Sequence, residues 1–338
     1  MRKIDIFTHI YPVNFFEKLM QVAPHFKDVG KRSRGVPMLL DLDERFRVMD
    51  RFEGYEQVLS LPTPPLEVMA SPAQAVDLAR AANDGMAELV ARYPRRFPTF
   101  VASLPYNDPD AAVREARRAV DELGARGIQI FSNVLGKPIS APEFLPLFET
   151  MALYDLPIWL HPYRGAAMTD YPTEERSQFE IWWTFGWPYE TSVAMARVVF
   201  AGLFDRWPAL KIIAHHMGAM APYFAGRLGP GWDQLGARTS DEDLSLVLKR
   251  LHKRPIDYFR MFYGDTALFG AYDATVCGLQ FFGVDHVLFA SDAPFDPEKG
   301  PMYIRETLAV LDRLPISAEE RERIYWRNAA ALLKLPLD

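Results

Sequence analysis

The sequence is poor in the features that mark several large classes of protein. Cys277 is the only cysteine among 338 residues, so no disulfide can form within the chain and a reducing compartment is expected. Acidic residues outnumber basic ones by 44 to 38, which gives no electrostatic reason to expect nucleic acid or an anionic membrane as a partner. No apolar run approaches the roughly 20 residues of a membrane-spanning helix, and MRKID at residues 1–5 does not resemble a signal peptide. We therefore expect a cytoplasmic protein.

No glycine-rich phosphate-binding motif follows the first apolar run, which disfavours an open, doubly wound nucleotide-binding sheet. Instead, short apolar runs alternate with longer amphipathic stretches, a pattern typical of βα units and a parallel sheet. The predicted strands are residues 3–8, 56–61, 99–104, 127–132, 157–161, 211–215, 260–265 and 286–291. Eight strands with helices between them favour an α/β fold closed as a (β/α)8 TIM barrel, with the open sheet as second choice. We expect one domain over residues 1–338.

The stretches between the predicted strands are of two kinds. Residues 77–93 and 108–124 have the apolar spacing of helices, and the second begins with Asp108 as a capping residue and stops at Gly124. Residues 12–40 and 164–188 depart from this pattern and are predicted insertions after strands 1 and 5. Both follow the carboxyl end of a strand, where barrel enzymes build their active sites.

Titratable residues stand at the ends of four predicted strands. His9, His161 and Asp292 each follow an apolar run, and a fourth run ends in the pair His215 and His216. A single histidine in such a place often just bonds a backbone carbonyl, but side chains at corresponding strand ends of a barrel converge. Two imidazoles and a carboxylate suit a borderline divalent ion such as Zn²⁺, and the same set also binds Fe²⁺. The sequence therefore predicts a metal site.

The two insertions contain candidate substrate-binding residues. The basic run KRSRG at 31–35 is usually solvated charge, but Arg32 or Arg34 could reach an anionic substrate. The aromatic run FEIWWTFGWP at 179–188 more often forms core or a subunit interface than a pocket. Trp183 and Trp187 are its candidate pocket residues.

Motifs along nearly the whole chain resemble the amidohydrolase superfamily, and within it the 2-amino-3-carboxymuconate-6-semialdehyde decarboxylase-like group. They include IDIFTHIYP, ARYPRRFPTFVASLP, ELGARGIQIFSN, LPIWLHP, the segment around AHHMG, FYGDTA and VLFASDAPF. The resemblance implies a metal-dependent, non-oxidative decarboxylase of a small aromatic or unsaturated carboxylic acid. It also implies a homodimer or larger homo-oligomer.

Carried over by motif, the resemblance assigns His9, His161 and Asp292 as ligands of one divalent ion, Zn²⁺ in first place and Mn²⁺ or Fe²⁺ as alternatives. His216, directly before Met-Gly, matches the catalytic histidine of the group, and Asp292 is a candidate proton donor. The preceding residue, His215, is then expected to pack or to contact the backbone.

The sequence departs from the family pattern at Phe7, where a further ligand, His or Glu, normally stands. Strand alternation places Asp5 on the opposite face, so it is a poor substitute. We expect the metal to bind with lower affinity through three protein ligands, and the position of Phe7 to accept a bulkier or more apolar part of the substrate.

Two other functions remain open. The first is a metal-dependent hydrolase or hydratase on the same scaffold, acting on a ring-cleavage-type or cyclic substrate, and an assay for released CO2 separates it from a decarboxylase. The second is a metal-free binding homologue, which Phe7 favours. The costly polar groups retained at His161, His216 and Asp292 argue against it.

Overall fold

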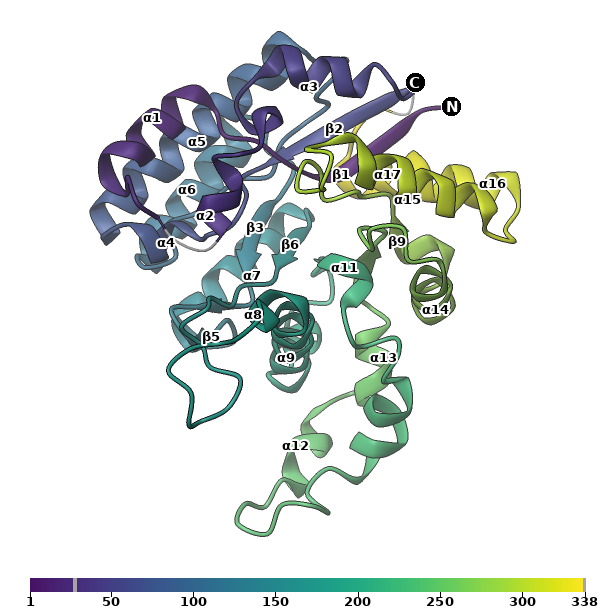
Figure 1. Ribbon diagram of the computed structural model, residues 1–338. Helices are drawn as coiled ribbons and strands as arrows, with labels where there is room; N and C mark the ends of the chain where they lie inside the picture. The colour runs from purple at the N-terminus through teal and green to yellow at the C-terminus, as the bar shows by residue number, and fades with distance from the viewer. Residues whose placement is uncertain (27–28, 337–338) are drawn as a thin grey trace.

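The computed structural model describes residues 1–26 and 29–336 and shows parallel strands surrounded by helices (Figure 1). The strands are β1 (Lys3–His9), β2 (Tyr55–Ser60), β3 (Ile128–Phe131), β4 (Asn133–Val134), β5 (Lys137–Pro138), β6 (Ile158–His161), β7 (Ile212–Ala214), β8 (Tyr263–Asp265) and β9 (Val287–Leu288). β1 pairs with β2, and β3, β6, β7, β8 and β9 form a second sheet in that order. All pairs in both sheets are parallel.

Single bridges join the two sheets into a ring. Residues 99–102 lie between β2 and β3, through the bridges Leu59 to Phe100 and Ala102 to Ile128. The segment after β9 bridges back to β1 between Thr8 and Ala293. The chain therefore has eight barrel positions, and the prediction of an α/β barrel is confirmed.

Apolar side chains fill the inside of this ring, as expected for strands that are covered on both faces. One buried cluster includes Ile4, Val58, Trp159, Ile213 and Leu288, each from a different strand. A larger cluster packs the outer faces of the strands against the helices. Burial on both sides holds the strand ends, and the residues they carry, in fixed positions.

The helices alternate with the strands and cover the barrel. They are α1 (Val13–Val22), α2 (Val29–Ser33), α3 (Leu42–Met49), α4 (Leu66–Met69), α5 (Pro72–Arg92), α6 (Pro109–Asp121), α7 (Leu145–Tyr154), α8 (Ile181–Thr184), α9 (Gly186–Phe200), α10 (Leu203–Arg206), α11 (His215–Gly218), α12 (Ser245–Arg250), α13 (Pro255–Phe259), α14 (Tyr272–Phe282), α15 (Pro301–Arg313), α16 (Ala318–Glu322) and α17 (Asn328–Leu333). Short 3-10 or π turns are η1 (Pro37–Leu39), η2 (Pro142–Phe144), η3 (Arg227–Gly231), η4 (Trp232–Gln234), η5 (Val284–His286) and η6 (Arg323–Arg327). The predicted cap is present: the Asp108 carboxylate accepts a hydrogen bond from the Ala111 backbone at the start of α6.

Most predicted boundaries are shifted by a few residues, and the largest differences from the predicted strands lie in three of them. Residues 99–104 form only isolated bridges, and residues 260–262 follow α13 as a turn, so β8 begins at Tyr263. The stretch 286–291 contributes only Val287–Leu288 as regular strand. A third excursion, between β7 and β8, was not predicted; it contains α12 and extends away from the barrel (Figure 1).

Among the described residues, no helix is both long and apolar enough to cross a membrane.

Candidate active site and metal centre

The titratable residues at the predicted strand ends lie together at one end of the barrel. His9 and His161 are the last residues of β1 and β6, His215 and His216 begin α11 directly after β7, and Asp292 follows β9. His216 is partly exposed to the cavity, and the other four are buried. The parallel strands bring these residues, distant in sequence, to one place.

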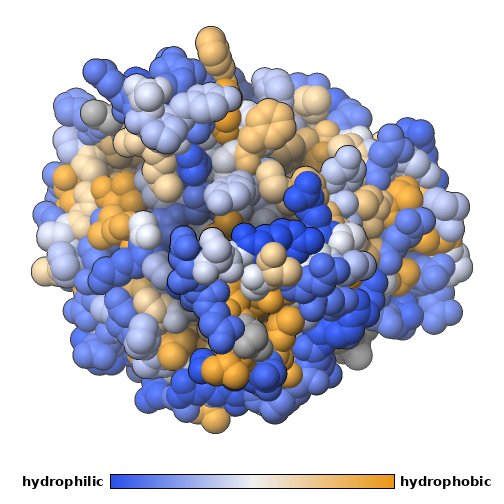
Figure 2. Space-filling model, turned by 90° about the horizontal axis from the view of Figure 1, so that it is seen from below, coloured by the Kyte–Doolittle hydropathy of each residue, from blue (hydrophilic) through white to orange (hydrophobic). Residues whose placement is uncertain are grey.

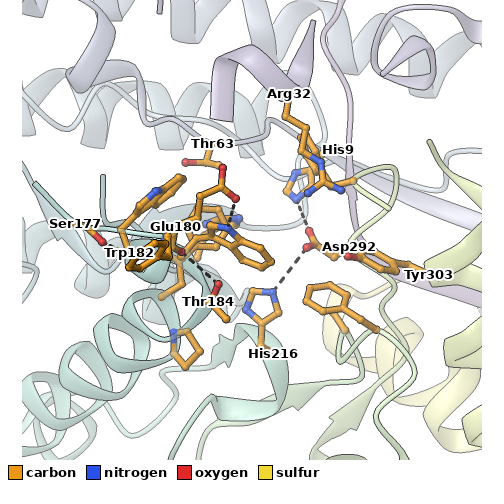
Figure 3. Close-up of a pocket in the computed structure, with 18 of the residues that line it drawn as sticks. His9, Arg32, Thr63, Ser177, Glu180, Trp182, Thr184, His216, Asp292 and Tyr303 are labelled. Carbon is orange, nitrogen blue, oxygen red and sulfur yellow. Dashed lines mark hydrogen bonds and ion pairs between the residues drawn. The ribbon is translucent and has the colours of Figure 1, made fainter. Parts of the chain in front are cut away.

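Three imidazoles, those of His9, His215 and His216, face the carboxylate of Asp292, and Figure 3 labels His9 and His216 among them. The Nε2 atom of His9 lies 2.9 Å from Oδ1, that of His215 lies 3.5 Å from the same oxygen, and that of His216 lies 3.7 Å from Oδ2. Burial opposes the charge on Asp292, but the three neighbouring imidazoles outweigh it and hold the pKa of the carboxyl well below its usual range. Asp292 is therefore an anion surrounded by nitrogen atoms.

Backbone carbonyls fix the orientation of two of the imidazoles. His9 Nδ1 lies 3.2 Å from the Leu61 carbonyl oxygen, and His161 Nδ1 lies 2.6 Å from that of Pro162. A carbonyl oxygen only accepts, so each Nδ1 carries the proton and each Nε2 keeps its lone pair when the ring is neutral. Burial, together with the neighbouring His215 and His9, holds the pKa of His161 well below its usual value.

His215 packs as predicted, against the Phe7 ring, but it also has polar contacts that the sequence analysis did not predict. It is fully buried, and its Nδ1 lies 2.7 Å from Oδ2 of Asp265, the last residue of β8. Its Nε2 has no hydrogen-bond partner among the described residues and faces Asp292. Burial lowers the pKa of His215, but the two carboxylates outweigh it and raise the pKa to about 9. His215 is thus a polar member of the site.

Phe7 also lies elsewhere than predicted. The β1–β2 register shifts between Asp5 and Thr8, and the fully buried Phe7 ring stacks on His215 with centroids 3.8 Å apart and planes at 16°. Phe7, which the sequence analysis expected to contact substrate, does not line the cavity described below. Asp5 does lie away from the cluster, where it accepts hydrogen bonds from Tyr55 and Ser291.

The backbone that carries the site is strained. His216, Met217 and Asp292 have positive φ values of 55°, 55° and 64°, a conformation that is costly for residues other than glycine. Gly218 has φ 69°, and a Cβ at that position would lie 2.5 Å from the Phe282 ring. The sharp turn after β7 directs both neighbouring histidines at Asp292.

A cavity of about 700 Å³ opens above this cluster. Its floor contains His9, His161, His216 and Asp292. Aromatic side chains form much of its walls, including Trp182, Trp183, Trp187, Phe269, Phe295 and Tyr303. The exposed cationic residues Lys31, Arg32 and Arg176 also line it. Such a cavity suits an aromatic anion of small to medium size.

The predicted substrate-binding residues are placed differently from one another. Arg32, Trp183 and Trp187 line the cavity, and the Trp187 ring lies 5.6 Å from that of His161. Arg34 does not line it; its guanidinium lies 5.2 Å above the Phe26 ring and donates to the Phe26 carbonyl. Helix α2 ends at Ser33, so Arg32 lies in the helix and Arg34 lies after it. The sequence of the basic run does not show this boundary.

The sequence prediction missed Asp265, which holds three groups of the site. Its carboxylate accepts hydrogen bonds from His215 Nδ1 and from the backbone N–H groups of His216 and Ala267. The signal was present, because Asp265 ends the run RMFYGD as His161 ends IWLH.

The donor atoms fit a divalent metal ion. With His9 neutral, its Nε2 lone pair faces Asp292 Oδ1 at 2.9 Å, a contact that needs either a proton on Nε2 or a bound cation. The candidate ligand atoms of His215, His216 and Asp292 all lie within 4.8 Å of one another. Imidazole nitrogens with a carboxylate oxygen are ligands that Zn²⁺, Mn²⁺ and Fe²⁺ share.

Comparison with known proteins agrees with this geometry. The amidohydrolase family model matches residues 4–335. The chain is 34% identical to γ-resorcylate decarboxylase of Polaromonas sp. over 88% of this chain and 89% of that protein. It is 29% identical to 2-amino-3-carboxymuconate-6-semialdehyde decarboxylase of Dictyostelium discoideum, covering 87% and 82% of the two chains.

A solved structure shows the same fold. It is a dihydroxybenzoic acid decarboxylase from Polaromonas sp. with bound manganese and the inhibitor 2-nitroresorcinol. It superposes with a TM-score of 0.76 at 29% identity, over 98% of this chain and 97% of the other. These findings confirm the predicted relationship to decarboxylases, and this chain belongs to the amidohydrolase family.

Proposed function

We propose that this protein is a metal-dependent, non-oxidative decarboxylase of a small aromatic carboxylic acid. The observation that carries the proposal is the group of imidazole Nε2 atoms around the Asp292 carboxylate, at the floor of an aromatic-walled cavity with cationic residues. The decarboxylases to which the chain is similar support the reaction class.

We propose that His9, His161 and Asp292 hold one divalent ion. Zn²⁺ suits this donor set, and the manganese in the related Polaromonas structure makes Mn²⁺ the main alternative. When bound, the ion supplies Lewis-acid chemistry, which orients a carboxylate and a neighbouring oxygen of the substrate and stabilises negative charge.

In this proposal His216 and Asp292 move the proton. Burial and the neighbouring His215 lower the pKa of His216, so at neutral pH its imidazole is unprotonated and takes a proton from solvent in the cavity that it lines, then passes it to Asp292. Asp292 then gives a proton to the ring carbon that bears the carboxylate. The bond from that carbon to the carboxyl group breaks, its electron pair returns to the ring, and CO2 leaves.

Other cavity residues bind and orient the substrate. Trp187 and Tyr303, on different segments of the wall, provide flat apolar surfaces for an aromatic ring. Arg32 is placed to pair with a second anionic or phenolic group. Together they hold the ring so that its carboxyl-bearing carbon faces Asp292.

In the test, metal-loaded protein is incubated separately with 2,6-dihydroxybenzoate and with 5-carboxyvanillate. CO2 and the decarboxylated phenol are then measured. We expect CO2 in equal amount to the phenol, and a rate about 10²–10⁴-fold lower in His216→Asn. His286→Asn is the matched control, because His286 stacks on Tyr263 outside the cavity. Hydrated or hydrolysed products without CO2 would favour the hydrolase or hydratase alternative instead.

We also propose that the chain forms a homodimer. A groove lined mainly by apolar residues runs beside α9, between Tyr189, Val193, Phe224 and Trp232. Tyr189 and the neighbouring Tyr223 are exposed. The face seen in Figure 2 likewise has several hydrophobic patches between hydrophilic residues. Exposed apolar surface of this kind is typical of subunit interfaces.

A further inference from the structure

Phe7 stands where the family pattern has a metal ligand, so the metal centre has one protein ligand fewer than that pattern supplies. The structure has a candidate for the missing ligand directly beside Phe7. Phe7 and His215 are in direct contact, with ring centroids 3.8 Å apart. We propose that His215 serves as the fourth protein ligand of the metal ion, in place of the residue that Phe7 replaces. This inference rests on the proposed metal-dependent function and concerns which residues hold the ion.

The first argument is the free donor atom of His215. The imidazole is fully buried, yet Nε2 has no hydrogen-bond partner among the described residues. A buried nitrogen without a partner is costly, and coordination of a metal ion would remove that cost.

The second argument is the partner of the other ring nitrogen. Nδ1 lies 2.7 Å from the buried carboxylate of Asp265. Histidines that ligate metals usually donate the second ring N–H to a carboxylate or carbonyl, which orients the ring and makes the ligating nitrogen more basic. In His9 and His161, the proposed ligands, Nδ1 contacts a backbone carbonyl oxygen in the same way. In all three rings an oxygen atom therefore orients Nδ1 and leaves Nε2 as the candidate ligand atom.

The third argument distinguishes His215 from His216. His9 and His215 both direct Nε2 at Oδ1 of Asp292, at 2.9 and 3.5 Å. Metal–ligand bonds of 2.0–2.2 Å place neighbouring ligand atoms roughly 2.8–3.6 Å apart in octahedral to tetrahedral geometry, a range that contains both distances. His216 instead faces Oδ2 at 3.7 Å and lines the cavity, where it stays available for proton transfer.

Phe7 contributes to this arrangement. Its ring lies nearly parallel to that of His215, at 16°, and fills the space against the His9 and His161 rings at 5.5 and 5.7 Å. A fixed stack holds the imidazole in the plane in which Nε2 meets Asp292. The loss of a ligand at position 7 and the recruitment of His215 are thus parts of one rearrangement.

The test measures Zn²⁺ and Mn²⁺ affinity of metal-stripped protein by competition with a chelator, together with the absorption spectrum of the Co²⁺-loaded protein. His215→Asn keeps an amide near Nδ1 for Asp265 but lacks a donor at Nε2. We expect affinity to fall by at least ~100-fold, more than the ~10–100-fold typical of an outer partner, and the Co²⁺ spectrum to change. His216→Asn is the comparison and should bind Zn²⁺ nearly as tightly as the natural chain.

A second variant restores the missing ligand. In Phe7→His/His215→Asn the new imidazole takes the family position, and we expect most of the Zn²⁺ affinity to return. If His215→Asn does not fold, Asp265→Asn tests the same ligand through its orienting carboxylate, with an expected loss of ~10–100-fold. Natural protein that binds one ion while His215→Asn binds it equally well would overturn this inference and leave the proposed function intact. Natural protein that binds no ion would overturn both.

Discussion

At the scale of single residues, the site depends on a few buried polar groups whose partners differ. Asp292 has imidazoles on both oxygens, and Asp265 holds His215 and the α11 backbone. Glu67 is the contrast, since neither of its carboxylate oxygens has a hydrogen-bond partner among the described residues. Buried charge is tolerated where it is compensated, and Glu67 therefore prefers its neutral form.

Glu67 makes stability depend on pH in a definite direction. Burial raises its pKa from 4.5 to about 8, so between these values the folded protein holds a proton that the unfolded chain has lost. The free energy of unfolding should therefore fall as pH rises from 4.5 to 8, by up to ~1.4 kcal/mol per pH unit from this group. Glu67→Gln cannot ionise and should show a shallower decline in urea denaturation series. Identical slopes in the two proteins would contradict the assignment.

The two arginines of the basic run provide a matched pair. Arg32 lines the cavity, and Arg34 lies over Phe26 instead. We expect Arg32→Ala to raise KM for an anionic aromatic substrate by ~10-fold, consistent with loss of a charged hydrogen bond, with kcat little changed. Arg34→Ala should leave both constants near their natural values. Equal effects of the two changes would show that the cavity does not use Arg32 for substrate.

At the scale of elements, α11 is the segment on which function most depends. It is short, its residues His216 and Met217 have positive φ values, and it carries both histidines of the pair. The short helix directs His215 and His216 to different oxygens of one carboxylate. Strain of this kind is maintained only by the packing around it.

Gly218 tests that packing. With φ 69° and the Phe282 ring 2.5 Å from an added Cβ, Gly218→Ala should lower the free energy of unfolding by ~1–3 kcal/mol and reduce CO2 release. Gly226→Ala is the control, because a Cβ there meets nothing within 4 Å. Chemical denaturation and activity assays of both variants check this. Equal stability of the two would mean that the turn after β7 is not constrained as the structure indicates.

The elements also show how far sequence reasoning reached. The barrel and the strand ends follow from apolar periodicity, because strand cores and helix faces are encoded locally, and the two insertions were predicted where that pattern breaks. The contacts of His215 could not be predicted, since the tight turn at His216 and the register shift before Thr8 arise from tertiary packing. For the same reason Phe7, predicted to face substrate, is packed beneath the site.

At the scale of the whole molecule, the barrel closes one end of the cavity and the excursions after β1 and β6 surround its mouth. Arg32 comes from the first and Trp183 from the second. The excursion after β7 extends away from the barrel (Figure 1), and together with α9 it forms the apolar groove. The catalytic end and the proposed subunit interface therefore use different excursions.

The proposed dimer leads to a prediction about mass. Sedimentation or light scattering should give about twice the chain mass of 38.6 kDa. Val193→Asp places a charge in the groove and should shift the population towards monomer. Leu153→Asp is the control, because Leu153 is exposed on α7 and does not line the groove. A natural chain that remains monomeric at high concentration would contradict the proposal.

The metal content of the protein tests the central claim most directly. The chain is purified without chelator or added metal and is analysed for divalent transition metals, before and after incubation with Zn²⁺ or Mn²⁺. The account predicts about one ion per chain, held despite Phe7. Protein that contains no ion and takes up none would contradict it.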